Sequence, residues 1–430
     1  MTASFISFGL LIVLMLVGMP IAFAMLLVGF LGLVYILSWA PAIGLLAQTT
    51  LDAGQAYELS VVPLFVLMGS FAARAGIADD LFAVAYVWLG RFRGGLAMAT
   101  IVACGAFSAM SGSSLATAAT MAKVAMPPMK RYGYADSIAA GSIAAGGTIG
   151  ILIPPSVVMI VYGLLTETDI GQLFIAGIIP GLITLVGYVL AIGVATWIKP
   201  SLAPRSEGAS IQNMITALRG VALFLALLVT VIGGIYLGVF TPTESAGIGA
   251  FGALILAIGR NGLSLQMLVE TLREAAGITA MLFFVLIGAL VYTAFLNIAG
   301  FSSWLSFVVT GLELSRLHLI LLLVVGYLIL GMFLESMSLI ILTIPIVFPL
   351  TQAAGIDPVW FGIFIVVLTE VSLITPPVGM NIFVLRSALK DIDVWTICRG
   401  LIPFYVFDII RIILFITVPA TVMLLPATMK

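Results

Sequence analysis

The sequence predicts an all-α polytopic membrane protein built from two copies of one folding unit. Three observations support this fold class. The 430 residues are 63% hydrophobic and 8% charged, with a mean hydropathy of +1.30, whereas soluble domains carry about 25% charged residues. Apolar runs of about 20 residues, the length at which a helix crosses a bilayer, recur from end to end. The third observation is an internal repeat at a constant offset of 222 positions, as from Ser114 to Ser336.

The repeat is clearest from Phe107 to Ser156, where it runs without a gap. Each copy begins with hydroxyl or carboxylate side chains in apolar sequence and ends in two prolines, which must break a membrane helix. Each copy is therefore expected to form a re-entrant hairpin followed by a broken helix. The matched residues are Met110 and Met332, Ser114 and Ser336, Pro127 and Pro349, Gly133 and Gly355, Pro154 and Pro376, and Pro155 and Pro377.

The N-terminal region is predicted to contain two membrane helices, a more polar stretch and a third span. Phe5–Gly18 and Pro20–Leu37 are apolar, and a proline suits the first turn of the second helix. Trp39–Leu59 is mixed in polarity and is interpreted as a loop or a surface helix, followed by a span at Val61–Arg74. Ala78–Arg93 carries apolar residues on one helical face, which predicts an amphipathic helix along the membrane interface. An ordinary cytosolic loop is the alternative.

The first hairpin consists of two segments that are each too short to cross the bilayer comfortably. They are Leu96–Met110 and Ala116–Met126, and they flank the sequence SGSS. We expect this tip to lie at membrane depth. Ala135–Leu165 is long enough to cross but contains Pro154 and Pro155, so we expect two half-helices joined by unwound chain.

A span and a polar linker, Leu173–Ile198 and Lys199–Arg219, separate the two halves of the chain. The second half is predicted to follow the plan of the first. Its elements are Val221–Phe240, Ser245–Ile258, an amphipathic Leu265–Ala275, a span Ile278–Ile298, a surface helix Ser302–Arg316, a hairpin of Leu317–Leu334 and Leu339–Leu350, a helix Trp360–Leu389 broken at Pro376 and Pro377, and a last span Leu401–Leu425.

Basic residues indicate how the chain is oriented, because cytoplasmic loops are enriched in Lys and Arg. With the N-terminus outside, only Arg316 and Lys430 fall clearly outside. The basic residues at or near the cytoplasm are Arg74, Arg91, Arg93, Lys130, Arg131, Lys199, Arg205, Arg219, Arg260, Arg273, Lys390 and Arg399. The same orientation inverts one repeat relative to the other. Inverted repeats whose broken helices meet at the midplane are typical of secondary transporters; a duplicated channel is the alternative.

The polar breaks predict sites for a small cation and an organic anion. Carbonyl ends and hydroxyl oxygens suit a hard cation such as Na⁺, and half-helix N-termini suit a carboxylate. The expected Na⁺ ligands of the first repeat are Ser111, Ser113 and Ser114, with carbonyls near Gly147 and Thr148. Those of the second repeat are Ser336 and Ser338, with carbonyls or hydroxyls near Val371, Ser372 and Thr375.

Four further polar residues are candidates for contacts with ions or solute. Glu335 is a carboxylate at membrane depth, which is a functional hypothesis by default; the alternative is a charge at a hydrated hairpin mouth. Glu370 precedes the second break and is expected either in a water-filled cavity or at the interface. Ser156 is placed to start a half-helix and meet an anion. Asn381 lies in the corresponding half-helix of the second repeat.

The sequence gives no support for catalysis or for a resident metal site. No GxSxG, HExxH or GxxxxGK[ST] motif occurs, and the single histidine, His318, has no nearby partner. Cys104 and Cys398 are interpreted as small buried residues, and the net charge of −1 does not suggest nucleic-acid binding. The N-terminus lacks a basic region, so we expect a first span and not a cleaved signal. Transport would then use an ion gradient, worth about 2.3 kcal/mol per charge at 100 mV.

Three motifs carry a resemblance to a known family. The sequences SGSSLATAATM, GYADSIAAGSIAAGGTIGILIPPS and LITPPVGMNIFVL resemble those of the large membrane subunit of tripartite ATP-independent periplasmic (TRAP) transporters, and the likeness covers essentially the whole chain. It implies an elevator-type fold and Na⁺-driven uptake of a carboxylate-bearing solute across the bacterial inner membrane. It also implies Na⁺ sites at the hairpin tips and broken-helix loops, and substrate contacts at Ser111, Ser156 and Glu335.

The resemblance further implies two protein partners, a small four-helix membrane subunit and a periplasmic solute-binding protein. The solute would be a C4-dicarboxylate, sialic acid or a similar organic acid. A carrier that works without a binding protein is the alternative, followed by a channel and, more distantly, an intramembrane enzyme. The expected domains are a scaffold at 1–95 and 171–316, transport parts at 96–170 and 317–392, and a C-terminal span at 393–430. Within the transport parts, the hairpins are expected at 96–128 and 317–351, and the broken helices at 135–165 and 358–389.

Overall fold

The computed structural model describes residues 2–55, 57–204, 211–262, 264–301, 303, 304, 307 and 315–429, and all regular elements within them are helices. Six helices are long and apolar enough to cross a membrane, or seven if the bent pair α4–α5 counts as one span. The all-α, polytopic membrane class is therefore confirmed. The main helices are α1 (Thr2–Leu16), α2 (Ile21–Leu37), α3 (Trp39–Gln55), α4 (Val61–Arg74), α5 (Ile77–Leu89), α6 (Gly95–Ser111), α7 (Ser114–Arg131), α8 (Asp136–Thr148), α9 (Val157–Thr166), α10 (Ile170–Ile198), α11 (Ile211–Tyr236), α12 (Pro242–Asn261), α13 (Leu265–Ile298), α15 (Arg316–Gly331), α16 (Ser336–Ala353), α17 (Pro358–Ile374), α18 (Met380–Ala388) and α19 (Val394–Thr417).

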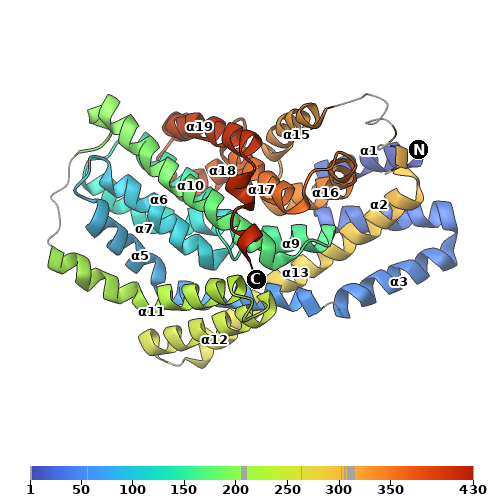
Figure 1. Ribbon diagram of the computed structural model, residues 1–430, viewed down its shortest axis with the longest axis horizontal. Coiled ribbons are helices and arrows are strands. Elements are labelled where there is room, and N and C mark those ends of the chain that lie inside the picture. Colours follow the sequence, from blue (N-terminus) through green and yellow to red (C-terminus); the bar gives the residue numbers. More distant parts are fainter. Residues whose placement is uncertain are drawn as a thin grey trace.

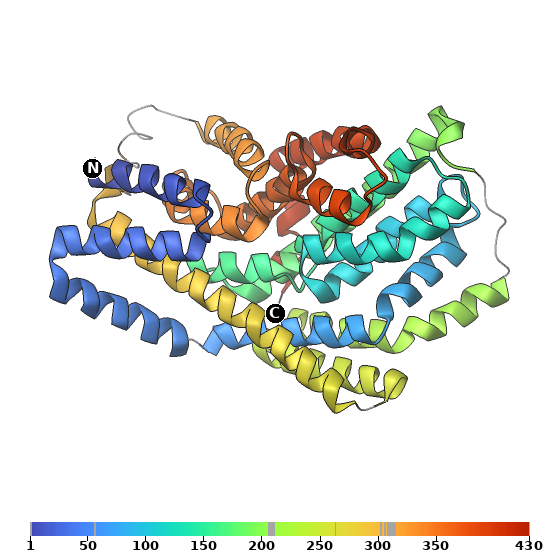
Figure 2. The ribbon, with the colours of Figure 1, turned by 180° about the vertical axis from the view of Figure 1, so that it is seen from behind.

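The helices form two groups that lie side by side (Figures 1 and 2). One group, called the frame below, consists of α1–α5 and α11–α13. In Figure 1, α11 and α12 run along its lower edge, α2 and α3 lie toward the right-hand end, and α13 runs from the middle of the molecule toward that end. The other, called the inner group, consists of α6–α10 and α15–α19 and contains both hairpins and both broken helices. It includes α10, which falls in the expected scaffold at 171–316 but packs on α6, α17 and α19. Within the frame, α2 packs on α13 and α12 packs on α4, whereas α5 packs on α6 and links the two groups.

Small residues allow close approach within the frame. A Cβ on Gly29 of α2 would lie 2.8 Å from the Tyr292 Cα of α13, and one on Gly288 would lie 2.6 Å from the Ala22 carbonyl oxygen. Membrane helices gain little from burying apolar surface against one another, because lipid is equally apolar, and such close backbone contacts are what hold them together.

The inner group is interlocked across the two halves of the sequence. Helix α7 of the first hairpin packs on α18 of the second broken helix, and α16 of the second hairpin packs on α9 of the first. Helices α8 and α19 touch at backbone distance, because a Cβ on Gly400 would overlap the Ser137 carbonyl oxygen. Each hairpin is therefore held partly by the broken helix of the other half.

Both broken helices end at the expected prolines. α8 runs through a short 3₁₀ turn, Ile149–Ile151, before the chain resumes as α9, and α17 is separated from α18 by the segment around Pro376 and Pro377. The peptide bond within each pair of prolines is cis. The hairpins are also present, as α6–α7 and α15–α16, although α7 continues through Pro127 and Pro128 to Arg131.

Some expectations about the frame and the linker are refined or corrected by the structure, and one lies largely outside the described residues. The amphipathic Leu265–Ala275 and the span Ile278–Ile298 are one continuous 34-residue helix, α13, because neither Gly277 nor any proline interrupts it. Of the two alternatives for Trp39–Leu59, a loop or a surface helix, the structure shows a helix at Trp39–Gln55. Ile211 already begins α11, so the predicted linker is shorter. The predicted surface helix Ser302–Arg316 lies largely outside the described residues.

Replacing Gly400 by alanine tests the packing of α8 on α19. The added methyl would overlap the Ser137 carbonyl, so we expect Gly400→Ala to cost about 1–3 kcal/mol of stability. The matched control is Gly326→Ala on α15, where nothing lies within 4 Å of the position that the added methyl would take and alanine is the better helix former. Thermal unfolding of the detergent-solubilised protein measures both. Equal melting temperatures for the two variants would contradict the packing.

Candidate functional site

The tip of the first hairpin is a tight polar turn between α6 and α7. Gly112 ends α6 with a φ of +56°, a conformation that favours glycine. The Ser113 hydroxyl then accepts a hydrogen bond from the Ala116 amide and caps α7. The Ser111 and Thr117 hydroxyls lie 2.7 Å apart. Three of the hydroxyls in this region are thus held in place by local contacts.

This tip packs directly against the first helix break. A Cβ on Gly150 would lie 3.1 Å from the Ser113 carbonyl oxygen, and one on Gly112 would lie 3.3 Å from the Pro155 carbonyl oxygen. Gly147 faces Ala118 of α7 at similarly close range. The residues predicted to form the first cation site therefore come from two segments that lie backbone to backbone.

A buried amide joins this region to the second half of the chain. The Ser114 hydroxyl donates to Asn381 Oδ1 at 2.9 Å, and Asn381 Nδ2 donates to the Ala144 carbonyl at 3.1 Å. Asn381 is fully buried, so both ends of its side chain need these partners. It links α7, α8 and α18. Sequence reasoning placed Asn381 in a half-helix but could not identify these contacts.

Glu335 begins the second hairpin's return helix. Its carboxylate accepts hydrogen bonds from the Met337 amide at 3.1 Å, the Ser338 amide at 3.3 Å and the Ser336 hydroxyl at 3.0 Å. The side chain is half-buried. A carboxylate at this position neutralises the partial positive charge of the helix N-terminus, so α16 is a poor place for a second anion.

The second hairpin and the second break also lie against each other. The Gly379 amide donates to the Met332 carbonyl at 3.1 Å. A Cβ on Gly331 would overlap the Ser372 hydroxyl, so the end of α15 lies against α17 at this serine. The arrangement repeats that of the first half, with a hairpin end packed on a broken helix.

The prolines explain which carbonyl groups the breaks release. In a helix each carbonyl accepts from the amide four residues later, and Pro376 and Pro377 have no amide hydrogen. The carbonyls of Ser372 and Leu373 therefore lose their helical partners. The Thr375 amide donates a hydrogen bond to the Ser372 carbonyl at 3.1 Å. The Leu373 carbonyl accepts no hydrogen bond from any of the described residues. A Cβ on Gly379 would lie 3.1 Å from both the Leu373 and Thr375 carbonyl oxygens, so these two oxygens converge.

The first break follows the same rule with one difference. Pro154 and Pro155 remove the helical partners of the Gly150 and Ile151 carbonyls. The Ser156 hydroxyl donates to the Ile151 carbonyl at 2.7 Å and accepts from the Met159 amide at 3.4 Å. Ser156 is fully buried, and its hydroxyl is occupied in capping α9. Any contact between Ser156 and an anion would therefore use its amide or require the hydroxyl to turn.

The donor set at both breaks fits a small hard cation. Carbonyl and hydroxyl oxygens are the ligands that such ions prefer. A side chain at position 379 would occupy the space beside the Leu373 and Thr375 carbonyl oxygens, and glycine leaves this space open. The Val371 carbonyl accepts from the Thr375 hydroxyl at 2.7 Å, and the Thr148 hydroxyl donates to the Ala145 carbonyl at 2.8 Å. These hydroxyls bond to their own helices, so their oxygens keep a lone pair for an ion.

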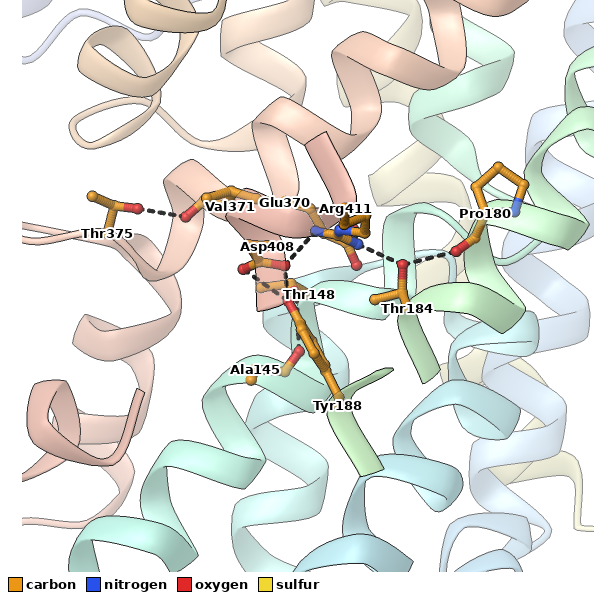
Figure 3. A network of polar contacts seen from close by, with 10 residues as sticks. All are labelled: Ala145, Thr148, Pro180, Thr184, Tyr188, Glu370, Val371, Thr375, Asp408 and Arg411. Atoms are coloured by element: carbon orange, nitrogen blue, oxygen red, sulfur yellow. Dashed lines mark hydrogen bonds and ion pairs between the residues drawn. The ribbon is translucent and has the colours of Figure 1, made fainter. Parts of the chain in front are cut away.

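A buried charge cluster lies behind the two breaks, and sequence reasoning missed most of it (Figure 3). Arg411 Nη1 lies 2.7 Å from Glu370 Oε2, and Arg411 Nη2 lies 2.8 Å from Asp408 Oδ1. The Tyr188 hydroxyl donates to Asp408 at 3.0 Å, and the Thr184 hydroxyl accepts from Arg411 at 2.5 Å. All three charged side chains are at most 1% exposed. The members come from α10, α17 and α19, and Thr148 of α8 lies beside Glu370.

The position of Glu370 corrects an expectation. It faces neither a water-filled cavity nor the interface, because it is fully buried in an ion pair with Arg411. The available signal was Asp408 and Arg411 themselves, two ionisable residues three positions apart in an apolar run. Such residues inside a membrane usually pair with one another.

Comparisons with known proteins identify the family. The family model described as "Tripartite ATP-independent periplasmic transporter, DctM component" matches residues 8–421. The chain is 36% identical over 400 residues to the C4-dicarboxylate TRAP transporter large permease protein DctM of Pseudomonas aeruginosa, covering 93% of each chain. It is 34% identical over 417 residues to the sialic acid TRAP transporter large permease protein SiaM of Vibrio cholerae, covering 95% of each.

Further relatives agree. The 2,3-diketo-L-gulonate TRAP transporter large permease protein YiaN of Escherichia coli is 30% identical over 413 residues, with 95% of each chain covered. Among solved structures, the YdaH transporter of Alcanivorax borkumensis matches with a TM-score of 0.66, covering 89% of this chain and 90% of that one. At 14% identity, that likeness shows the fold alone. The chain belongs to the DctM family of TRAP transporter large permease components, so it is a transporter subunit and not an enzyme.

Proposed function

We propose that this chain carries out Na⁺-coupled secondary uptake of a carboxylate-bearing small solute across the bacterial inner membrane. The solute class is a C4-dicarboxylate, sialic acid or a similar organic acid. Three relatives that are 30–36% identical are named for C4-dicarboxylates, sialic acid and 2,3-diketo-L-gulonate, which carry a carboxylate, whereas a relative that is 31% identical is named for isethionate, which carries a sulfonate. A periplasmic binding protein delivers the solute, a small four-helix subunit accompanies the chain, and the N-terminus lies in the periplasm.

The observation that carries the proposal is the pair of converging carbonyl oxygens at Leu373 and Thr375. Lipid cannot satisfy such groups, and membrane proteins tolerate non-helical backbone only where it is buried, hydrated or bound to a ligand. One Na⁺ binds there, and Ser336, Ser338, Val371 and Ser372 supply further ligands. A second binds between the SGSS tip and the first break, where the Ser113 carbonyl faces Gly150. Because this carbonyl accepts from the Thr117 amide and hydroxyl, the ion would replace the hydroxyl as its partner.

The anion binds where half-helix N-termini carry partial positive charge. The termini of α7 and α9 lie together at the first break, with Ser111 and Ser156 close by. Glu335 already neutralises the terminus of α16, so its carboxylate contacts a hydroxyl or amine of the solute, or balances a cation. The solute is therefore bound by its acid group at one repeat and by its neutral groups at the other.

Alternating access follows from the two helix groups. The inner group carries both sites, and the frame lies beside it without contributing any predicted ligand. We propose that the inner group moves past the frame as an elevator. The bend of 67° between α4 and α5, at Gly76 with a φ of +73°, provides a connection that can change its angle.

Uptake into liposomes tests the coupling. The chain, reconstituted with its small subunit and supplied with solute-loaded binding protein, should accumulate solute above equilibrium only with an inward Na⁺ gradient. Replacing Na⁺ by K⁺ should abolish accumulation. Equilibration without Na⁺ would indicate a channel, and undiminished uptake without the binding protein would indicate a self-sufficient carrier.

Ser114→Ala tests the first cation site. Removing the hydroxyl that bonds Asn381 should raise the Na⁺ concentration for half-maximal uptake by roughly five-fold or more. Ser142→Ala is the matched control, because this buried serine on α8 bonds only the Ala139 carbonyl of its own helix. A Na⁺ dependence that is unchanged in both variants would remove Ser114 from the site.

Cross-linking tests the elevator. Cysteines replacing Phe65 of the frame and Phe174 of the inner group, whose ring centroids are 5.7 Å apart, should abolish uptake when joined by a short thiol reagent. The control pair replaces Phe5 and Phe301, at 6.1 Å, with neither position in the inner group. Both pairs are made in a background with Cys104 and Cys398 replaced. Full uptake by the cross-linked Phe65–Phe174 pair would exclude movement of the inner group past α4.

A further inference from the structure

We propose that Arg411 and Tyr405 of α19 are positioning residues that set the Na⁺ affinity of the second helix break. Helix α19 contributes no predicted ligand. It nevertheless contacts the second break at the Ile374 carbonyl, through Tyr405, and the preceding turn of α17 at Glu370, through Arg411. This inference rests on the proposed Na⁺ coupling, and it identifies the part of the molecule on which that coupling depends.

Tyr405 acts at the break itself. Its hydroxyl donates a hydrogen bond to the Ile374 carbonyl. That carbonyl belongs to the peptide plane between Ile374 and Thr375, which lies between the two converging oxygens of Leu373 and Thr375. The amide of the same plane donates to the Ser372 carbonyl at 3.1 Å. The plane is therefore fixed at both ends, and this fixes the directions of the neighbouring carbonyls.

Arg411 acts one turn earlier. Its guanidinium binds Glu370 at 2.7 Å, in the last full turn of α17 before the break. Asp408 lies on the other side of the guanidinium at 2.8 Å, and the Tyr188 ring lies 5.7 Å from its central carbon. A planar guanidinium can hold two carboxylates in fixed directions, whereas a lysine ammonium offers only a point charge. Glu370 thus cannot turn without breaking a buried ion pair.

The same cluster reaches the first break. Thr148, the last residue of α8, lies beside Glu370 (Figure 3). Helix α19 also packs on α8 at Gly141 and Gly400. One rigid helix therefore sets the position of both breaks relative to each other. Arg411 Nε, Arg411 Nη2 and Glu370 Oε1 have no hydrogen-bond partner among the described residues, so Arg411 Nη2 and Asp408 form an ion pair without a well-aligned hydrogen bond. The hydrogen bonds that Arg411 does make are those of Nη1 to Glu370 and to Thr184.

The decisive comparison uses two tyrosines. Tyr405→Phe removes only the hydroxyl on the Ile374 carbonyl. Tyr292→Phe is the matched control in the frame, where the Tyr292 and Ser7 hydroxyls lie 3.1 Å apart. The measurement is thermal stabilisation of the purified complex by Na⁺, with K⁺ as the ion control, because a bound ion stabilises the folded state according to its affinity. Tyr405→Phe should raise the half-saturating Na⁺ concentration by roughly two- to ten-fold, the effect of one lost hydrogen bond.

A charge-neutral variant tests Arg411. Arg411→Met alone would leave two buried carboxylates without a counter-charge and is expected to misfold. The triple variant Arg411→Met, Glu370→Met, Asp408→Leu removes all three charges, and replacing a buried ion cluster by hydrophobic residues of similar volume often leaves stability intact. It should melt near the wild-type temperature in K⁺ but require roughly ten-fold more Na⁺ or greater. Arg411→Lys keeps the charge but loses the planar fork, so its half-saturating Na⁺ concentration should be intermediate.

The outcomes separate the two claims. If the wild-type complex gains no Na⁺-specific stabilisation, the Na⁺ coupling itself is wrong. If the wild type is stabilised but Tyr405→Phe behaves like Tyr292→Phe, the positioning role of α19 is wrong while the coupling stands. If Tyr405→Phe lowers the melting temperature equally in Na⁺ and K⁺ with unchanged half-saturation, the tyrosine is only structural and the inference is overturned.

Discussion

The structure depends on hydrogen-bonding groups that prolines release inside the bilayer. Consecutive prolines at 154–155 and at 376–377 leave the carbonyls four residues earlier without helical partners. The chain satisfies some of them internally, through Ser156 and through the Thr375 amide. It leaves the Leu373 and Thr375 oxygens near a common point, since each lies 3.1 Å from the position that a Cβ on Gly379 would take. In water such groups would simply be solvated, but inside a membrane an unsatisfied carbonyl costs several kcal/mol. The ends of both hairpins pack against the segments whose carbonyls have lost their helical partners.

Exposed and buried ion pairs contribute differently to the stability of this protein. The Lys130–Asp391 pair joins the end of α7 to the chain after α18 at 2.7 Å, but both side chains are exposed. Its hydrogen bond raises the pKa of Lys130 and lowers the pKa of Asp391, and exposed pairs of this kind add little stability. Burying Arg411 with two carboxylates costs several kcal/mol per ion before pairing. A cluster of that cost, placed against both helix breaks, is better explained by the geometry it imposes than by the stability it adds.

Local chemistry made much of the fold predictable. Proline and glycine act on their own backbone, so the two breaks could be located from Pro154, Pro155, Pro376 and Pro377, and the first hairpin from the SGSS sequence that contains Gly112. The frame helices could be located from their apolar runs. Partners distant in sequence could not be found in this way. Asn381 bonds Ser114 across 267 positions and Arg411 bonds Thr184 across 227, and no periodicity encodes such pairs. The split of Leu265–Ile298 into two elements failed for a related reason, since a polar first half does not end a helix that its neighbours continue to support.

The most direct test of the account is a cryo-electron microscopy map of the assembled transporter in saturating Na⁺, compared with a map in choline. The account predicts ion density within ligand distance of the Leu373 and Thr375 carbonyl oxygens, and beside the Ser113 carbonyl, in the Na⁺ map alone. Identical density at both breaks in the two maps, with Na⁺ bound elsewhere or nowhere, would contradict it.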